Sequence, residues 1–365
     1  MAAETPADIL VAAVENRNEE SISFLAAMKE QHPKTVRFSV SSTSDDLLSL
    51  QSSSIAHQCL EKPYDTHELE ILITRAFTLR ERLQGCALRE RLHDLDALPS
   101  LPALYRRIIE AINSTDTSIG EIAELLQQDI SLSAKLLQIV NSAAIGLRNQ
   151  VTDVAQAATL LGLEKISAMV LAVEVFSMVG QKALPPGFSL DALWSHSIRV
   201  AEGARTIAVD ACDDRKAIDA TFTAGLLHDV GLILLAANFP DELTESLRRA
   251  KTDETTLWEA ERETFAATHA ELGGYLLELW GLPDPIVEAI TYHDIPSALP
   301  EEEYPSAVPK HGFTPLTGVH VANYFSADER QTAYGCVEGE LDVLYMERTG
   351  YSAKLEDWLV LCHDT

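Results

Sequence analysis

The chain has 365 residues, enough for two or three domains, and its 46% hydrophobic and 23% charged residues are typical of a globular protein with sizeable cores. Its formal net charge of -28 excludes nucleic acid and anionic membrane surfaces as ready partners, because both require clustered Lys and Arg. The five cysteines have no CxxC spacing, which predicts reduced thiols, and we expect no export signal and no membrane span. The predicted location is therefore cytoplasmic.

Residues 1–80 have the pattern of a small α/β domain. Two short runs rich in β-branched residues, 7–14 and 35–42, predict buried parallel strands with an amphipathic helix between them. A third strand is expected at 56–62, before a helix that begins near Asp65. This alternation is typical of βαβ units.

A charged helical stretch connects this domain to the rest of the chain. The helix that begins near Asp65 continues through the linker 81–97, where leucines recur at roughly helical spacing. The linker is predicted to be either a signalling helix, through which two copies of the chain would form a homodimer, or a plain solvated connection. The residues leave both interpretations open.

From residue 98 to residue 300, nearly every segment has the 3.6-residue period of an α-helix, which predicts an all-α domain of at least eight helices. Ser118 followed by Glu121 predicts a capping box, and a further helix is expected to start at Ser131. The predicted fold class is therefore multi-domain: a partial α/β domain followed by an all-helical one. After an acidic, Pro-rich break, residues 301–365 are expected to form a helical extension that packs on the all-α domain.

The segment 223–236 places one His–Asp pair inside an apolar helical run. A buried polar pair such as His228 and Asp229 is costly unless other groups bond to it. The pair therefore belongs either to a metal site or to a hydrogen-bonded cluster between packed helices. The four tryptophans are predicted to anchor the core or an interface, and no Arg-rich cluster supplies a basic pocket for a free dinucleotide.

Several separated motifs of the helical half resemble the HD-related output domain, HDOD. They occur in order over residues 98–300, and include "LPSLPALYRRI", "LLQQDISLSAKLLQIVNSAAIG", "LWSHSIRVAEGARTIA", "AGLLHDVGLILLA" and "ELGGYLLELWGLPDPIVEAITYHD". The resemblance implies an HD-like helical domain that relays a signal through protein contacts.

The first eighty residues resemble the last two-thirds of a response-regulator receiver, in a degenerate and truncated form of that flavodoxin-like fold. Ser41 corresponds to the switch Ser/Thr, and Lys62, followed by Pro63, corresponds to the strand-end lysine. Ala13 stands where a receiver has its phosphoacceptor Asp, and the strand that carries the Mg²⁺-binding acidic pair has no counterpart here. Phosphoryl transfer to Asp needs both groups, so the resemblance implies a receiver that is unable to accept phosphate.

In the wider HD superfamily, a His, an adjacent His–Asp pair and a distant Asp bind a divalent metal. The resemblance assigns His196 and the pair His228–Asp229 to these roles, and it puts Asn323, a weak neutral ligand, in place of the distant Asp. Leu232 replaces a Lys that is common in catalytic members, and the Tyr-Pro elements of HD-GYP phosphodiesterases do not occur in the corresponding motif. The site is therefore predicted to be degenerate.

Two further histidines, His269 and His293, occupy positions similar to the secondary ligands of binuclear members, and Asp294 stands where many relatives have a second His. The predicted ligand set of the degenerate site is His196, His228, Asp229 and His293. In the competing hypothesis these side chains are a metal-free polar cluster that locks helix packing.

Two functions follow from these patterns. The favoured one is a bacterial signal-transduction output or scaffold protein with no catalytic residues and no required cofactor. It would act through protein–protein contacts with two-component or cyclic-di-GMP signalling proteins. The alternative is a metal-dependent phosphohydrolase or cyclic-nucleotide phosphodiesterase, which Asn323, Leu232 and the acidic charge disfavour. A divalent metal is the one cofactor that the residues suggest.

Overall fold

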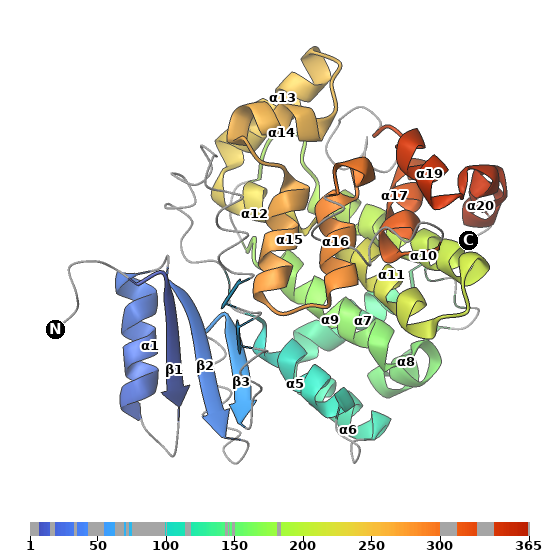
Figure 1. Cartoon of the computed structure of the whole chain (residues 1–365). Helices are drawn as coiled ribbons and strands as arrows, with labels where there is room; N and C mark the ends of the chain where they lie inside the picture. Colours follow the sequence, from blue (N-terminus) through green and yellow to red (C-terminus); the bar gives the residue numbers. More distant parts are fainter. Residues whose placement is uncertain are drawn as a thin grey trace. The chain divides into compact units, whose positions relative to one another are not determined.

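The structure is a computed structural model, and it divides the chain into two compact units (Figure 1). The N-terminal unit contains Met1–Ile109 and Tyr275–Leu282, and the helical unit contains Glu110–Gly274 and Pro283–Thr365. The structure describes residues 7–14, 19–32, 35–42, 55–62, 69–70, 73–74, 99, 101–113, 118–142, 145, 147, 150–180, 184–299, 312–326 and 339–363. The predicted linker 81–97 and residues 300–311 of the acidic break lie outside the described residues.

The N-terminal unit contains a small parallel sheet. Its strands β1 (Ile9–Val14), β2 (Val36–Ser42) and β3 (Gln58–Lys62) pair in the order β1-β2-β3, and α1 (Glu19–Gln31) packs against β1 (Figure 1). The sheet is centred on β2, in which Val36, Phe38 and Val40 alternate with Arg37, Ser39 and Ser41, and all six residues are buried. The predicted small parallel α/β piece is confirmed.

The core of this unit combines residues that are distant in sequence. Apolar side chains of β2 and β3 pack with Leu279, which ends helix α15, and Leu25 of α1 packs with Val14 in a second cluster. The indole Nε1–H of Trp280 donates to the carbonyl of Pro99 over 2.8 Å. This bond ties the segment that precedes the helices to the returning segment 275–282.

The rest of the described chain is helical, so the predicted all-α domain is confirmed. The helices are α5 (Ala103–Asn113), α6 (Ile119–Gln127), α7 (Ile130–Val140), α8 (Val154–Leu161), α9 (Leu163–Ser177), α10 (Leu190–Ala211), α11 (Arg215–Leu227), α12 (Val230–Asn238), α13 (Pro240–Thr252), α14 (Leu257–Phe265), α15 (His269–Leu279), α16 (Asp284–Tyr292), α17 (Pro315–Phe325), α19 (Val343–Thr349) and α20 (Leu355–His363). Within the helical unit, α10 packs against α11, α17 and α20. Residues of α9, α10 and α11 supply much of its apolar core.

Caps explain where several of these helices begin and end. The capping box of Ser118 and Glu121 is present at the start of α6, as predicted. Helix α7 starts earlier than predicted, because Asp129, rather than Ser131, caps it by accepting from the backbone N–H of Leu132. Helix α19 lies within the range 301–365 for which a helical extension is predicted, although its own bounds are not.

The apolar run through the His–Asp pair is broken rather than continuous, which corrects the prediction of one helix. Helix α11 ends at Leu227, and α12 begins at Val230, so His228 and Asp229 lie at the break. The segment Arg215–Asn238 is long and apolar enough to cross a membrane by composition, yet 89% of its most apolar window is buried inside the fold. Burial of this kind is typical of a core segment.

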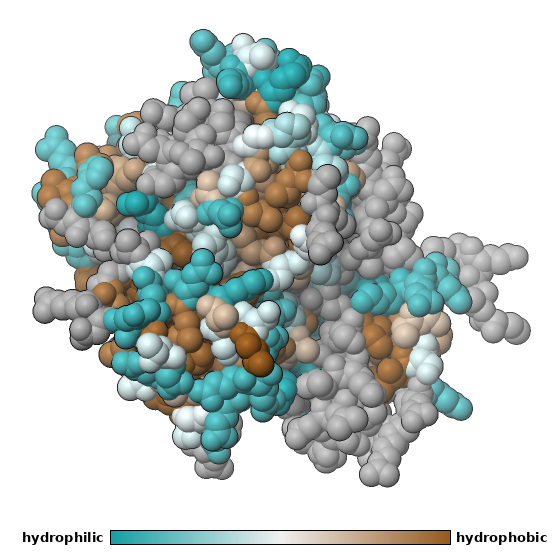
Figure 2. Space-filling view, turned by 180° about the vertical axis from the view of Figure 1, so that it is seen from behind, coloured by the Kyte–Doolittle hydropathy of each residue, from teal (hydrophilic) through white to brown (hydrophobic). Residues whose placement is uncertain are grey.

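Charged helices cover part of the surface of the helical unit. Glu245 of α13 pairs with Arg248 and Arg249, all on the exposed side of that helix. Hydrophilic side chains gather at the top of Figure 2, where Figure 1 places α13 and α14. At the C-terminus, Trp358 of α20 donates to Asp210 of α10, so the last helix is fastened to the longest one.

Candidate metal centre

Five buried side chains converge in the helical unit. His196 lies within α10, and His228 and Asp229 lie between α11 and α12. His269 begins α15, and His293 directly follows α16 as its C-cap. Their residues are between 0% and 3% exposed. The structure brings together the four residues of the predicted ligand set, and it adds His269, which the sequence placed only in a secondary position.

Asp229 lies between two groups of nitrogen donors. Its Oδ2 atom is 3.3 Å from Nε2 of His228 and 3.7 Å from Nε2 of His196, and the two imidazole Nε2 atoms are 3.2 Å apart. Its Oδ1 atom is 3.3 Å from Nε2 of His269 and 3.7 Å from Nε2 of His293. The two carboxylate oxygens therefore face different pairs of histidines.

Asp294 adds a second carboxylate to one side of the cluster. Its oxygens lie 3.5 Å from Nε2 of His269 and 3.6 Å from Nε2 of His293. The sequence placed Asp294 only where many relatives have a second His, outside the predicted ligand set. In the structure both Asp294 and His293 belong to the site, because Asp294 lies beside His293, whose Nε2 atom lies beside Oδ1 of Asp229.

Two glycines allow the helices to approach closely enough for this convergence. A Cβ atom on Gly231 would lie 1.9 Å from the carbonyl oxygen of His269, and one on Gly225 would lie 2.8 Å from Cα of Ala201. Helix α12 can thus begin against the start of α15, and α11 can lie against α10. A side chain at either glycine would push the histidines apart.

Hydrogen bonds at the far side of three rings point their Nε2 atoms inward. Nδ1 of His228 donates to the carbonyl of Gly225, and Nδ1 of His293 donates to that of Ile290, each over 2.8 Å. Nδ1 of His269 lies 2.7 Å from Oε2 of Glu261, which also accepts from the backbone N–H of His269. Metal-binding histidines are commonly oriented by this type of outer bond.

The charge states of the cluster follow from burial and from its neighbours. Burial alone would raise the pKa of Asp229, but its electrostatic and hydrogen-bond contacts with His228 and His269 hold it well below its usual value. Burial would likewise lower the pKa of His269, yet Glu261 and Asp229 raise it well above its usual value. Burial lowers the pKa of His293 to about 4, so this imidazole is neutral and can donate a lone pair.

The donor set fits a divalent cation. Neither oxygen of Asp229 nor Nε2 of His269 or His293 has a hydrogen-bond partner among the described residues, although all four atoms are buried. A cation about 2.0–2.2 Å from each donor would separate neighbouring donors by roughly 3.0–3.5 Å, close to the spacings found here. His196, His228 and Asp229 could hold one ion, and Asp229, His269 and His293 a second. Imidazole with carboxylate suits Zn, Fe, Mn or Ni.

The two substitutions noted in the sequence lie in the core. Asn323 of α17 is 4% exposed, and its Oδ1 atom has no hydrogen-bond partner among the described residues. Leu232 of α12 is fully buried, so it supplies packing where a Lys would have supplied charge. Glu261 could not be predicted from the sequence, because it lies eight residues before its partner His269, across the turn between α14 and α15.

The C-terminal segment is bonded to the edge of the cluster. Nδ1 of His320 donates to the backbone carbonyl of His293 over 2.7 Å, and Nε2 of the same ring accepts from the backbone N–H of Asp342. The carboxylate of Asp342 accepts from the backbone N–H groups of Ser297 and Tyr345. Residues after α17 therefore help to fix the end of α16.

The three residues of the receiver resemblance lie at one edge of the sheet. Val14, which follows Ala13, is paired with Ser41, and Ser42 is paired with Lys62, so all three predicted positions are at the carboxyl ends of parallel strands. Ala13 is exposed, whereas Ser41 is 6% exposed. The strand–helix–strand piece thus resembles a receiver only in part.

These features define a class of protein: a helical domain of HD type, with a His–Asp pair buried at a helix break, preceded by a small α/β piece. The HDOD domain family matches residues 98–296, more than half of the chain. The protein therefore belongs to the HDOD family.

The chain is also similar to individual proteins. An uncharacterized protein of Treponema pallidum (strain Nichols) is 28% identical over 229 residues, which are 61% of this chain and 42% of that protein. The chain thus spans less than half the length of this relative. An HDOD domain protein of unknown function from Geobacter sulfurreducens has a similar solved structure, with a TM-score of 0.53, 22% identity, and coverage of 80% of this chain and 98% of that one.

A protein from Marinobacter aquaeolei VT8, named provisionally as a signal transduction protein, is similar over a longer stretch. The TM-score is 0.54 at 18% identity, and the match covers 97% of this chain and 88% of the other. At this identity the similarity shows the fold alone.

Proposed function

We propose that the protein is a signal-transduction scaffold whose HDOD domain acts through protein contacts, and whose His/Asp cluster holds a divalent cation as a structural centre. The observation that carries this proposal is the burial of the cluster: the side chains of His196, His228 and His293 are fully buried, and those of Asp229 and His269 are 2% and 4% exposed. Closed metal sites contribute folding free energy, whereas catalytic sites keep a coordination position open.

Hydrolysis of a phosphoester requires more than metal ligands. A metal ion with an open position supplies a Lewis acid and an activated water, and a substrate must reach both. Here Asp294, the most exposed member of the cluster, has a side chain only 14% exposed. The apolar Leu232 and the neutral Asn323 stand where the HD pattern has charged residues. Both observations favour a structural role.

The N-terminal unit fits the same proposal as a degenerate receiver of flavodoxin-like type. Ala13 has no oxygen with which to form an acyl phosphate, while Ser41 and Lys62 keep their places at the strand ends. We assign this unit to docking, with partners among cytoplasmic two-component or cyclic-di-GMP signalling proteins. Incubation with labelled acetyl phosphate should leave the chain unlabelled, and covalent labelling would contradict the assignment.

One observation favours a second function, a metal-dependent phosphohydrolase. Asp229 turns one oxygen to His196 and His228 and the other to His269 and His293, which is an arrangement suited to two bridged ions. Two-ion sites can hold both the attacking and the leaving oxygen of a phosphoryl centre. This candidate requires an opening of the helices around the cluster.

Hydrolysis of bis(4-nitrophenyl) phosphate by the Mn²⁺-loaded full chain separates the two functions. We expect no turnover above that of His228→Ala, with His363→Ala as a control because His363 is an exposed histidine at the end of α20. Turnover in the parent and in the His363 variant that disappears in the His228 variant would establish the phosphohydrolase instead.

A further inference from the structure

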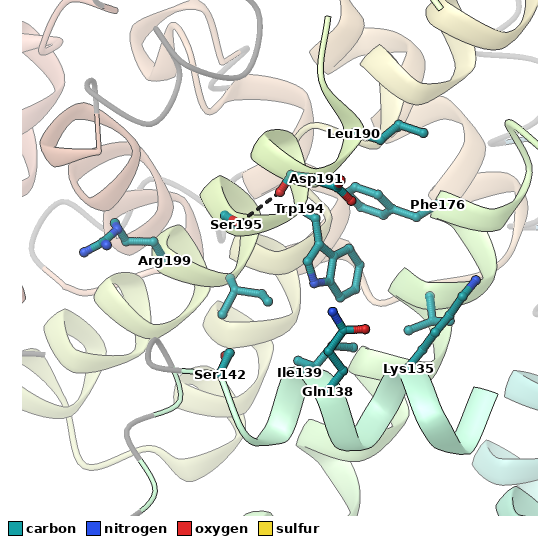
Figure 3. Close-up of a pocket in the computed structure, with 12 residues that line it drawn as sticks. Lys135, Gln138, Ile139, Ser142, Phe176, Leu190, Asp191, Trp194, Ser195 and Arg199 are labelled. Carbon is teal, nitrogen blue, oxygen red and sulfur yellow. Dashed lines mark hydrogen bonds between the residues drawn. The ribbon is translucent and has the colours of Figure 1, made fainter. Parts of the chain in front are cut away.

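A cavity of about 520 Å³ lies in the helical unit, between α7, α9 and α10 (Figure 3). Small-molecule sites typically have volumes of about 300–1,000 Å³. The residues that line the cavity include none of the His/Asp cluster. Helix α10 contributes to both features, with Trp194 in the cavity and His196 in the cluster. The cavity is therefore a separate feature.

The wall of the cavity is aromatic at its centre. Trp194 and Phe176 meet edge to face, with ring centroids 4.5 Å apart and planes at 89°. Buried Ile139, Val173 and Ile198 complete the apolar lining. The sequence predicted Trp194 to be a core or interface anchor, but its indole is only half-buried and lines this cavity. A half-buried indole next to apolar side chains is a stacking surface for a planar ring.

Hydrogen-bonding groups surround this aromatic wall. Figure 3 shows the amide of Gln138 beside the indole, with Lys135 at one end of the cavity and Ser142 and Arg199 at the other. The hydroxyl of Ser142 is buried and has no hydrogen-bond partner among the described residues. Such a group costs free energy unless a ligand or water bonds to it.

Charge distinguishes the two ends of the cavity. Lys135 donates to the hydroxyl of Ser177 and lies near the carboxyl of Glu174, so its charge is partly neutralised. Asp191 lines the cavity at the start of α10. Arg199 follows it by about two turns of that helix and is exposed. Arg199 and the hydroxyl of Ser142 lie at the other end from Lys135, and both are groups that can bind a phosphate oxygen.

We propose that the cavity binds a nucleotide, with the base stacked on Trp194 and bonded at its edge by Gln138, and with the phosphate held by Arg199 and the hydroxyl of Ser142. An amide side chain can donate to and accept from a base edge at once, and a guanidinium can bind two phosphate oxygens. The sequence showed no Arg-rich cluster, because this site uses one arginine together with neutral donors from another helix.

Isothermal titration of the full chain with AMP and GMP, their nucleosides and inorganic phosphate tests this proposal. We expect at least one monophosphate to bind. Its nucleoside should bind at least roughly tenfold more weakly, and phosphate alone should show no binding at about 1 mM. Arg199→Gln should weaken the monophosphate roughly tenfold and leave the nucleoside unchanged, whereas Trp194→Ala should weaken both by roughly tenfold or more.

Two controls keep the result interpretable. Lys251→Gln removes an exposed positive charge on α13, outside the cavity lining, and should leave binding unchanged. Gln138→Ala changes an exposed residue that the proposal places at the base edge. It is the test of base binding to use if the Trp194 variant does not fold. The proposal is overturned if no nucleotide binds, if Arg199→Gln has no effect, or if nucleoside and monophosphate bind equally.

Discussion

Buried charge is accommodated in different ways in the two units. In the N-terminal unit, Arg37 is fully buried, and its guanidinium donates to the carbonyls of Thr35 and Ile55 over 2.8 and 2.9 Å, with the ring of His57 at 3.2 Å. In the helical unit, Asp229 is 2% exposed, but its oxygens have no hydrogen-bond partner among the described residues. Protein atoms are sufficient for the first site, whereas the second needs a proton or a cation.

A third buried ionisable group is accommodated differently from both Arg37 and Asp229. Glu288 of α16 is 5% exposed, and burial together with Asp284 raises its pKa to about 8. The carboxyl is therefore mostly protonated, and so uncharged, at neutral pH. The three sites show that burial of a charge is tolerated through protein donors, through a proton or, as we propose for Asp229, through a bound cation. The substitutions at Asp229, Arg37 and Glu288 described below each test one of these three ways of burying a charged group.

The largest effect is expected at Asp229. Asp229→Ala removes the carboxylate that both histidine pairs share, and breaking a buried charged cluster typically costs about 3–5 kcal/mol of unfolding free energy. Both the bound metal and the thermal stability of the helical unit should decrease, as measured by elemental analysis and calorimetry. Asp229→Asn, which keeps the shape but not the charge, should lose metal to a similar extent. Full retention of metal in both variants would place the cation elsewhere.

Substitution of Arg37 should also lower the unfolding free energy, but it should leave the metal content unchanged. Arg37→Met leaves the carbonyls of Thr35 and Ile55 without their donor, which should reduce the unfolding free energy of the N-terminal unit by about 3 kcal/mol. Chemical denaturation followed by hydrogen exchange in β2 measures this loss. Metal content should equal that of the parent chain. A loss of metal would show that the two sites are coupled.

Glu288 predicts a pH dependence. The folded chain binds this proton more tightly than the unfolded chain, whose glutamate has a pKa near 4.5, so the contribution to stability falls as the pH rises from 4.5 through about 8. Glu288→Gln removes this dependence and should be more stable than the parent by about 2–3 kcal/mol at pH 9. Denaturation curves of both chains at pH 5 and pH 9 provide the measurement, and parallel curves would contradict the assignment.

The smallest effect is expected at Asp342. Its carboxylate caps α19 and accepts from the backbone N–H of Ser297, so Asp342→Ala should cost about 1 kcal/mol, as helix caps do. Thermal denaturation checks this value, with Asp342→Asn expected to retain part of it. The backbone bond from residue 342 to His320 persists in both variants, so metal content should not change.

The sequence was most informative where local chemistry decides the structure. The capping box at Ser118, the short parallel strands and the helical periods all depend on neighbouring residues, and they were predicted. The helix break at His228 was not, because it depends on Gly231 packing against the start of α15, about forty residues further along the chain. Tertiary contacts overrode the local helical pattern there.

The candidate site also combines residues that the sequence predicted with an arrangement that it could not predict. The motif resemblance named His196, His228, Asp229 and His293, but it could not show that Asp229 lies between two pairs of histidines. That arrangement depends on the packing of α10, α15 and α16. The role of Glu261 depends on a close turn after α14, where Ala266 has a φ of 59°.

The metal content of the purified full chain tests the central claim most directly. After exposure to Zn²⁺ or Mn²⁺ and removal of loosely bound ions by gel filtration, we predict at least one ion per chain, a higher melting temperature than after chelation, and loss of both in Asp229→Ala. A chain that stays metal-free after this exposure, with the same melting temperature before and after chelation, would show that protons alone satisfy the cluster.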